Sequence, residues 1–415
     1  MRACWSGSLM RDLAGRGFGA TRIGNTRETV FAEMSALSQQ HGAVNLGQGF
    51  PDFPGPGFVK EAARRAIDGD HNQYAHPHGV LTLREAIARE WGARFGTNID
   101  PLRQVTVTSG ATEAVFDIIL ALIEPGDELV TFEPFYDSYP ASVTMAGGTM
   151  KVVRLEPPEW SFDPEALRAA ITAHTRVILL NTPHNPTGKV FSRTELEFIA
   201  SVAMEHDLLV VTDEVYDRIL FDDAVHVPIA TLPGMWERTI TINSVGKTFS
   251  LTGWKVGYAI GPERLIDAMR SVHQWVTFAT STPFQVAMAE AIPAATANGY
   301  YLDLERDYHE RRDVMVKILA SAGLPPLRSS GSFFVMTGFG DHAFANDVDF
   351  CRWLIVEIGV TPIPPSAFYL EPATAPRLLR FCFAKRLATL HEAGRRLEHL
   401  SVAGNPARTR RDDFK

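Results

Sequence analysis

Four apolar stretches separated by helix-like segments constrain the fold of this chain most strongly. They are residues 128–132, 176–180, 208–212 and 239–242. Each is rich in apolar or β-branched residues along almost its whole length, which is typical of a strand buried on both faces. Helical segments such as residues 193–206 lie between them. This alternation predicts an α/β fold, with a mostly parallel central sheet and helices on both faces.

The first and last thirds of the chain add further elements. Residues 58–68 and 82–95 have the apolar spacing of amphipathic helices, and a strand at 104–108 leads into a helix that ends near Leu122. Beyond about residue 290 the pattern changes, and it predicts a smaller α+β domain. The elements expected in that domain are helices at 302–322, 347–358 and 387–400 and strands at 332–336 and 378–383.

We therefore predict three parts. Residues 1–45 form an N-terminal extension and arm that packs with the small domain, residues 46–290 form a large domain, and residues 291–415 form the small C-terminal domain. The first 24 or so residues mix Gly, Arg and Ser and are expected to be a loose extension. The tail from Gly404 is expected to be disordered and solvated.

Composition excludes several classes of protein. The net charge is −8 without a long charged block, which argues against nucleic acid as a main partner. No apolar run approaches the ~18 residues of a membrane span, and no secretory peptide is recognisable. Cys4, Cys351 and Cys382 fit neither a disulfide framework nor a zinc pattern, so we expect a reducing, cytoplasmic location and no metal site.

Polar clusters follow the predicted strands. In sheets of this type, ligands bind outside the carboxyl ends of the strands. The clusters begin at Ser109, Glu133, Asn181, Asp213 and Ser244. Their shared position at strand ends predicts one binding site.

Lys247 has the most distinctive setting. It follows the strand at 239–242, between Gly246 and Thr248, and Lys255 lies eight residues further on. A lysine that condenses with an aldehyde must be held beside a cofactor with a lowered pKa, and burial or a neighbouring cation provides this. Lys247 is thus the predicted Schiff-base residue for an aldehyde-bearing pyridine phosphate, and later the acid and base for the proton shift.

The other clusters suit the remaining parts of such a cofactor. Asp213 is placed to pair with the ring nitrogen, which keeps the ring an electron sink. Asn185 and Tyr216 can donate to the ring's phenolate oxygen, and Tyr136 can stack on the ring face. The predicted phosphate ligands are Ala111 and Thr112, at the start of a helix, with Ser244 and Lys255.

Each cluster taken alone also has a plain structural explanation. The lysines could be surface residues in a glycine-rich loop, Asp213 could be a helix cap, and Asn185 could belong to a turn before Pro186. The tyrosines could be ordinary half-buried aromatic residues. Their common order and position at strand ends favour the cofactor site.

Several motifs give the chain a specific resemblance from about residue 30 to 400. It resembles class I, fold-type I aminotransferases that use pyridoxal 5′-phosphate, and within them the bacterial methionine aminotransferase and kynurenine–glutamine transaminase subgroup. The motifs are NLGQGFPDF (45–53), NQY (72–74), EPFYDSY (133–139), NTPHNPTG (181–188), DEVY (213–216), SVGKTFSLTGWK (244–255) and RFCFAK (380–385).

The resemblance implies further roles. Arg380 would bind the substrate α-carboxylate, with help from Gly49 and Asn185. Tyr74 would reach the phosphate of a second subunit and Phe278 its substrate pocket, which implies a homodimer with shared sites. An amino acid and a 2-oxo acid would be the small-molecule partners.

The resemblance leaves the substrate open. Some kynurenine transaminases have histidine where this chain has Ala279, which disfavours kynurenine. Phe278 and Phe31 suggest an apolar pocket for an uncharged donor: methionine first, then aromatic residues and glutamine. Alternatives are an N-succinyldiaminopimelate or kynurenine transaminase, a C–S β-lyase on the same scaffold, or a non-enzymatic regulator, for which the N-terminal segment is too short to hold a DNA-binding domain.

Overall fold

The computed structural model describes residue 22 and residues 30–400. Almost all of the loose extension expected in the first 24 or so residues, and the whole tail from Gly404, lie outside the described residues. Within them, no helix is both long enough and apolar enough to cross a membrane.

A seven-stranded sheet forms the centre of the molecule. Its strand order is β2-β8-β7-β6-β5-β3-β4, and every neighbouring pair is parallel except the two pairs that β8 makes with β2 and β7. The strands are β2 (Val105–Thr108), β3 (Glu128–Glu133), β4 (Thr149–Arg154), β5 (Thr175–Asn181), β6 (Leu209–Asp213), β7 (Thr239–Ser244) and β8 (Gly257–Ile260). The predicted mostly parallel sheet is confirmed, and β4 and β8 add to the strands that the sequence predicted.

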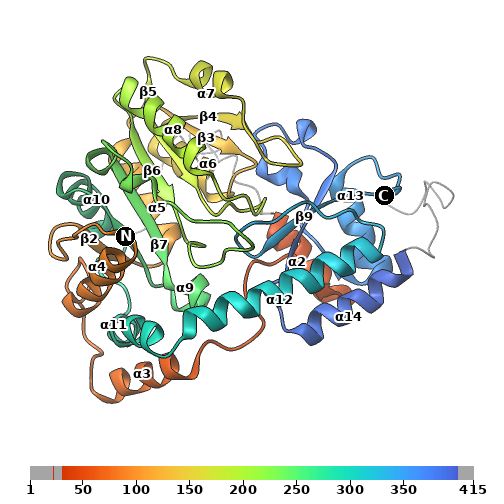
Figure 1. Ribbon diagram of the computed structural model, residues 1–415, viewed down its shortest axis with the longest axis horizontal. Helices are drawn as coiled ribbons and strands as arrows, with labels where there is room; N and C mark the ends of the chain where they lie inside the picture. The colour runs from red at the N-terminus through yellow and green to blue at the C-terminus, as the bar shows by residue number, and fades with distance from the viewer. Residues whose placement is uncertain (1–21, 23–29, 401–415) are drawn as a thin grey trace, which may run out of the picture.

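Helices cover both faces of this sheet (Figure 1). On one face, α5 (Ala111–Leu122), α6 (Ser138–Ala146) and α10 (Glu263–Val276) share an apolar core with the strands. On the other, α7 (Pro164–Ala170) and α8 (Arg193–Glu205) form a second core. A capping box of Ser192 and Glu195 begins α8, because the two residues satisfy each other's backbone N–H groups.

Three helices close the β2–β8 edge. They are α3 (Gly57–Asp68), α4 (Leu81–Phe95) and α11 (Thr282–Ala297), and Trp91 packs there with Val105 and Ile260. The short helix α9 (Val245–Thr248) follows β7 directly. This puts Lys247 at the carboxyl edge of the sheet.

The C-terminal elements form a separate core with the first described helix. They are α12 (Tyr300–Ser321), β9 (Phe334–Gly338), α13 (Asp347–Trp353) with the π-helical turn η5 (Leu354–Ile358), β10 (Val360–Thr361), β11 (Leu378–Cys382) and α14 (Leu387–Leu397). Helix α2 (Val30–His41) packs against α13, η5 and β10 (Figure 1), and the two-residue strand β1 (Val44–Asn45) pairs with β10 in parallel. The division into three parts at residues 45 and 290 stays a prediction.

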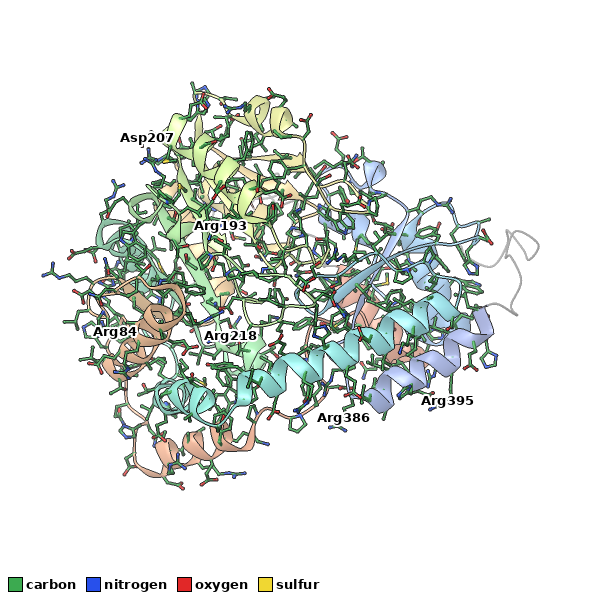
Figure 2. The ribbon with its side chains drawn as sticks, viewed as in Figure 1. Arg84, Arg193, Asp207, Arg218, Arg386 and Arg395 are labelled. Atoms are coloured by element: carbon green, nitrogen blue, oxygen red, sulfur yellow. The ribbon has the colours of Figure 1, made fainter. Side chains whose placement is uncertain are left out.

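Exposed charged side chains are spread over both parts of the molecule. Figure 2 labels Arg193 on α8 and Arg395 on α14. Arg193 pairs with Glu197, four positions along the helix, and Arg395 pairs with Glu392, three positions before it. Such exposed pairs contribute only ~0–1 kcal/mol each. The stability of the fold therefore rests on its apolar cores.

Candidate active site

The carboxyl ends of the parallel strands open into one cavity of about 250 Å³. Asn181 ends β5, Asp213 ends β6 and Ser244 ends β7, and all three line it. The first residues of α5 form a further wall. Arg380 reaches the cavity from β11 of the C-terminal elements. The cavity thus lies where a ligand is expected in a sheet of this type.

Most of the residues predicted to form a site line this cavity. They are Gly49, Ala111, Thr112, Tyr136, Asn185, Asp213, Tyr216, Ser244, Lys247, Lys255 and Arg380. Phe31, suggested for the donor pocket, lines it too. The two predicted residues that do not line it are Tyr74 and Phe278.

Lys247 projects its amine into the cavity. Its Nζ donates to the carbonyl of Gly49 at 3.3 Å and lies near the rings of Tyr216 and Phe333. Burial lowers the pKa of Lys247 to about 8, because the charged form loses hydration. A sizeable fraction of the amine is therefore neutral, and able to attack a carbonyl, near neutral pH.

Asp213 is a buried carboxylate at the end of β6. Its Oδ2 accepts a 2.8 Å hydrogen bond from the hydroxyl of Tyr139, and its Oδ1 accepts from the backbone N–H of Val215 at 3.4 Å. Burial raises the pKa of Asp213 despite these donors. A protonated ring nitrogen would supply the positive charge that favours its ionised form, so this carboxylate fits a pyridine cofactor.

The first turn of α5 has the shape of a phosphate site. Gly110 precedes the helix with φ +81°, and a Cβ there would lie 3.1 Å from Nζ of Lys255. A Cβ on Gly257 would lie 2.5 Å from the carbonyl carbon of Gly110. Glycine at both positions lets the helix start, the lysine and β8 approach closely, which brings free N–H groups and a cation to one anion.

Arg380 is buried among aromatic rings but keeps an unused donor. Its two terminal nitrogens donate to Oδ1 of Asn185 at 2.9 Å and to the carbonyl of Gly47 at 2.8 Å, whereas Nε has no partner among the residues that the structure describes. Burial lowers the pKa of Arg380 to about 10. A carboxylate bound here would neutralise the buried positive charge of the arginine.

Sequence reasoning assigned no role to four residues of the cavity region. Tyr139 orients Asp213, and Asn181 accepts from the N–H of Asn185 and donates to the carbonyl of Asp213. Phe334 lies 4.2 Å from the guanidinium of Arg380, and Asp137 lines the cavity. Tyr139 and Asp137 belong to the same EPFYDSY motif as Tyr136. Their presence in this motif was the sequence signal that could have identified them as site residues.

Asp137 is the second carboxylate of the cavity. It is half-buried, its side chain does not cap α6, and burial raises its pKa. Asp213 points to a different partner, Tyr139. Asp137 and Arg380 both line the cavity, and the positive charge of the arginine counteracts the rise in the pKa of Asp137.

Tyr74 and Phe278 lie on the surface. Their rings are 5.4 Å apart, and 86% of Tyr74 and 44% of Phe278 are exposed. The chain's own cavity does not include them. Both side chains are thus available to a neighbouring molecule.

Comparison with known proteins agrees with this geometry. Residues 41–397 match the model of the family described as aminotransferase class I and II. The chain is 40% identical to the methionine aminotransferase of Escherichia coli (strain K12), covering 90% of this chain and 96% of the relative. It is 39% identical to human kynurenine–oxoglutarate transaminase 1, covering 92% and 98%. The solved structure of N-succinyldiaminopimelate aminotransferase from Mycobacterium tuberculosis matches with a TM-score of 0.89 and 44% identity, covering 92% of this chain and all of that one.

Proposed function

The chain belongs to the class I and II aminotransferases, and from this premise we propose that it is a pyridoxal phosphate enzyme that transfers the amino group of an uncharged amino acid to a 2-oxo acid. The observation that carries the proposal is the position of Lys247. Its amine shares one cavity with the buried Asp213 and with Arg380. A nucleophilic amine, an anion for a ring nitrogen and a carboxylate-binding arginine are the groups that this reaction requires.

When bound, the cofactor supplies an electron sink for the charge that develops at the substrate α-carbon. The residues of the chain do the rest. Ala111, Thr112, Ser244 and Lys255 would hold the phosphate, and Asp213, kept in place by Tyr139, would hold the ring nitrogen.

The substrate end is organised by Arg380. It would bind the α-carboxylate with Asn185 and the N–H of Gly49, and so hold the substrate in the cavity that Lys247 also lines. Lys247 would then move the proton between substrate atoms.

The charges of the cavity favour an uncharged donor side chain. Among the described residues that line it, the cations are Lys247, Lys255 and Arg380, and each already has a role. A second substrate carboxylate would meet no free cation and would face Asp137. Phe31 and Phe334 offer apolar surface for a thioether or a ring.

We propose methionine as the first donor, followed by aromatic residues and glutamine. An N-succinyldiaminopimelate donor is the main alternative, since a similar solved structure carries that name. Kynurenine is the next, because a relative is named for it, although Ala279 disfavours it. A C–S β-lyase would use the same cofactor residues and differ only in its products.

We further propose a cytoplasmic homodimer. The exposed pair of Tyr74 and Phe278 would complete the neighbour's site, and an isologous interface is the usual arrangement of homo-oligomers. The free, buried thiols of Cys351 and Cys382 are compatible with a reducing compartment.

Product analysis tests the reaction class. Purified protein with added pyridoxal phosphate, methionine and phenylpyruvate should form phenylalanine and the oxo acid of methionine in equal amounts. Lys247→Ala should form neither. Ammonia and a free thiol as the main products would instead establish a lyase. If neither the transamination products nor the lyase products form with any donor offered, an enzymatic role is refuted.

A further inference from the structure

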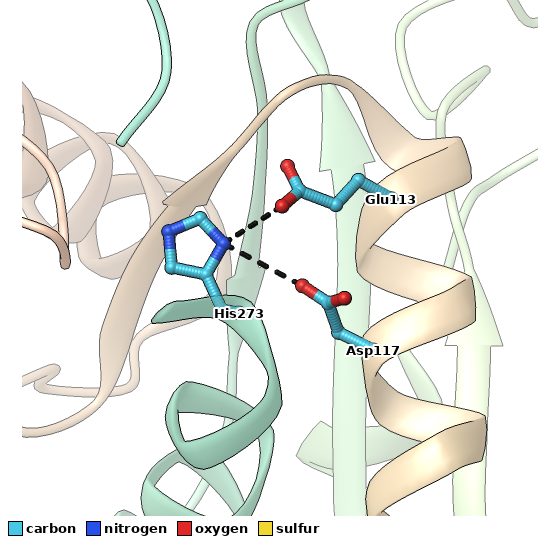
Figure 3. Close-up of side chains that lie close together, drawn as sticks. All are labelled: Glu113, Asp117 and His273. Carbon is cyan, nitrogen blue, oxygen red and sulfur yellow. Dashed lines mark hydrogen bonds and ion pairs between the residues drawn. The ribbon is translucent and has the colours of Figure 1, made fainter. Parts of the chain in front are cut away.

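A buried histidine, His273 on α10, lies behind the phosphate end of the cavity. Its Nδ1 is 2.9 Å from Oε1 of Glu113 and 3.5 Å from Oδ2 of Asp117, both on α5 (Figure 3). Its Nε2 is 2.8 Å from the carbonyl oxygen of Pro77. The His273 side chain is 1% exposed and the two acidic side chains are 6% and 0% exposed. None of these residues lines the cavity.

The partners of His273 fix its protonation state. A carbonyl oxygen can only accept a hydrogen bond, so Nε2 must carry a proton. A carboxylate also accepts, so Nδ1 must carry one as well. Burial by itself lowers the pKa of His273, but the acidic side chains of Asp117 and Glu113 and the carbonyl of Pro77 outweigh it and raise the pKa to about 10. The ring is therefore an imidazolium that donates in two directions.

The two directions lead to different parts of the predicted site. Through Nδ1, His273 holds Glu113, whose other oxygen accepts from the N–H of Ser109. Ser109 and Glu113 flank Ala111 and Thr112, the start of the phosphate-binding turn. Through Nε2, His273 holds Pro77, three residues after Tyr74.

The backbone carbonyl of His273 also closes the C-terminal end of α10 (Glu263–Val276), just before Phe278. The backbone N–H groups of Thr277 and Phe278 both donate to its carbonyl, at 3.1 and 3.0 Å. One residue thus joins the phosphate turn of this subunit to the segments that bear Tyr74 and Phe278, which are predicted to serve the neighbouring subunit.

We infer that His273 is a positioning residue, whose imidazolium links the phosphate-binding turn of α5 to the 74–79 loop and so sets the affinity of the enzyme for its phosphate-bearing cofactor. This inference rests on the proposed pyridoxal phosphate cofactor, but not on the identity of the amino donor. His273 acts through Glu113 and Pro77 and does not itself contact the ligand.

Other charged groups surround this link. On the loop side, burial lowers the pKa of His76, and of His78 to about 4, so both are neutral near pH 7. On α10, Arg270 donates to Thr106 and pairs with Asp267. Arg84 donates to the carbonyl of Gly79 and supports the loop from a second side. Among these groups, His273 is the one that bridges to α5.

A bound cation is the competing explanation. The ligand atoms of Glu113, Asp117 and His273 lie within 4.8 Å of one another, and neither oxygen of Asp117 has a hydrogen-bond partner within the described part of the chain. A metal ion would replace the Nδ1 proton. The 2.9 Å separation of Nδ1 and Oε1 is an ordinary hydrogen-bond length, which favours the proton.

A double-mutant cycle on cofactor affinity tests the link. We expect His273→Gln and Glu113→Gln each to weaken the Kd for pyridoxal phosphate ~10-fold or more, because each removes a charge-assisted hydrogen bond. The double variant should be no more than ~2-fold weaker than the more affected single variant. His206→Gln, an exposed histidine beyond α8, is the matched control and should change Kd by less than ~2-fold. Additive effects of the two substitutions would overturn the inference.

Hydrogen exchange on the cofactor-free protein provides a readout that does not need activity. In both single variants, exchange should accelerate in residues 105–118 and in residues 72–80, although His273 lies in neither segment. Acceleration confined to α10 would contradict the link, and so would a stoichiometric metal ion in the purified wild-type protein. Failure of every donor in the activity assay, with the Kd pattern intact, would refute the proposed reaction and leave this inference standing.

Discussion

The hydroxyl of Tyr139 donates a 2.8 Å hydrogen bond to Oδ2 of Asp213, and both side chains are buried. Tyr139 lies at the start of α6 and Asp213 at the end of β6. The bond fixes the carboxylate at the bottom of the cavity. It also means that the orientation of the predicted ring-nitrogen partner depends on a residue that lies behind it.

Substitutions of Asp213 and Tyr139 should lower the reaction rate by different amounts. Asp213→Ala should lower the rate of the half-reaction with methionine by roughly 10²–10³-fold, the usual effect of removing a preorganised electrostatic group. Tyr139→Phe should lower it by about tenfold, since the carboxylate stays but loses one donor. Stopped-flow absorbance measures both rates. Equal rates for Asp213→Ala and wild type would remove Asp213 from its role.

The amine of Lys247 should titrate near pH 8. A lysine reacts with acylating reagents only when neutral, so the labelling rate of Lys247 in cofactor-free protein should rise as the pH increases through about 8 and level off above it. Peptide mass spectrometry at several pH values gives the rate for this residue, and Lys247→Ala identifies its peptide. A rate that is still rising steeply at pH 10 would show an ordinary lysine.

Much of this architecture could be predicted from the sequence, because the polar residues of the site directly follow segments that are easily recognised as strands. Strands β5, β6 and β7 are rich in apolar or β-branched residues, and they end at Asn181, Asp213 and Ser244 respectively. The sheet order was not predictable. Strand β8 is short, antiparallel and preceded by the glycine-rich cofactor motif, so its sequence resembles a loop.

Contacts between residues far apart in the sequence also could not be predicted. The bond from Arg380 to Asn185 and the bond between His273 and Glu113 each join residues more than 150 positions apart, and no local pattern marks them. Arg380 itself was identified through the resemblance to a family. Without that resemblance, it is only a charged residue near the start of a predicted strand. Glu113 and His273 are unremarkable helix residues in sequence.

Mixed dimers should test whether the sites are shared. Lys247→Ala and Tyr74→Ala proteins should each be nearly inactive, but reassembly of an equal mixture should restore about a quarter of wild-type activity. Half of the dimers would be mixed, and each of these would hold one intact site, made of Lys247 from one subunit and Tyr74 from the other. No recovery despite subunit exchange, or a fully active monomer in light scattering, would refute the shared site.

Asp137 should discriminate against a charged donor. Asp137→Asn keeps the shape of the side chain and removes its charge, so kcat/KM for glutamate should rise relative to glutamine by ~10-fold or more, about 1.4 kcal/mol. The value for methionine should change by less than ~3-fold. Asp207→Asn, at an exposed position (Figure 2), is the control. An unchanged ratio of glutamate to glutamine would show that Asp137 does not face the donor side chain.

The most direct test of the whole account is a donor panel with one common oxo acid. We predict that kcat/KM is highest for methionine and lower for phenylalanine, glutamine and kynurenine. For aspartate and N-succinyldiaminopimelate it should be at least ~10-fold lower than for methionine, since a second carboxylate finds no free cation among the described residues that line the cavity. The range among the uncharged donors should be broad, because an apolar pocket separates similar side chains by only ~1–3 kcal/mol per methylene. If aspartate or N-succinyldiaminopimelate exceeds methionine by tenfold or more, the proposed donor pocket is wrong.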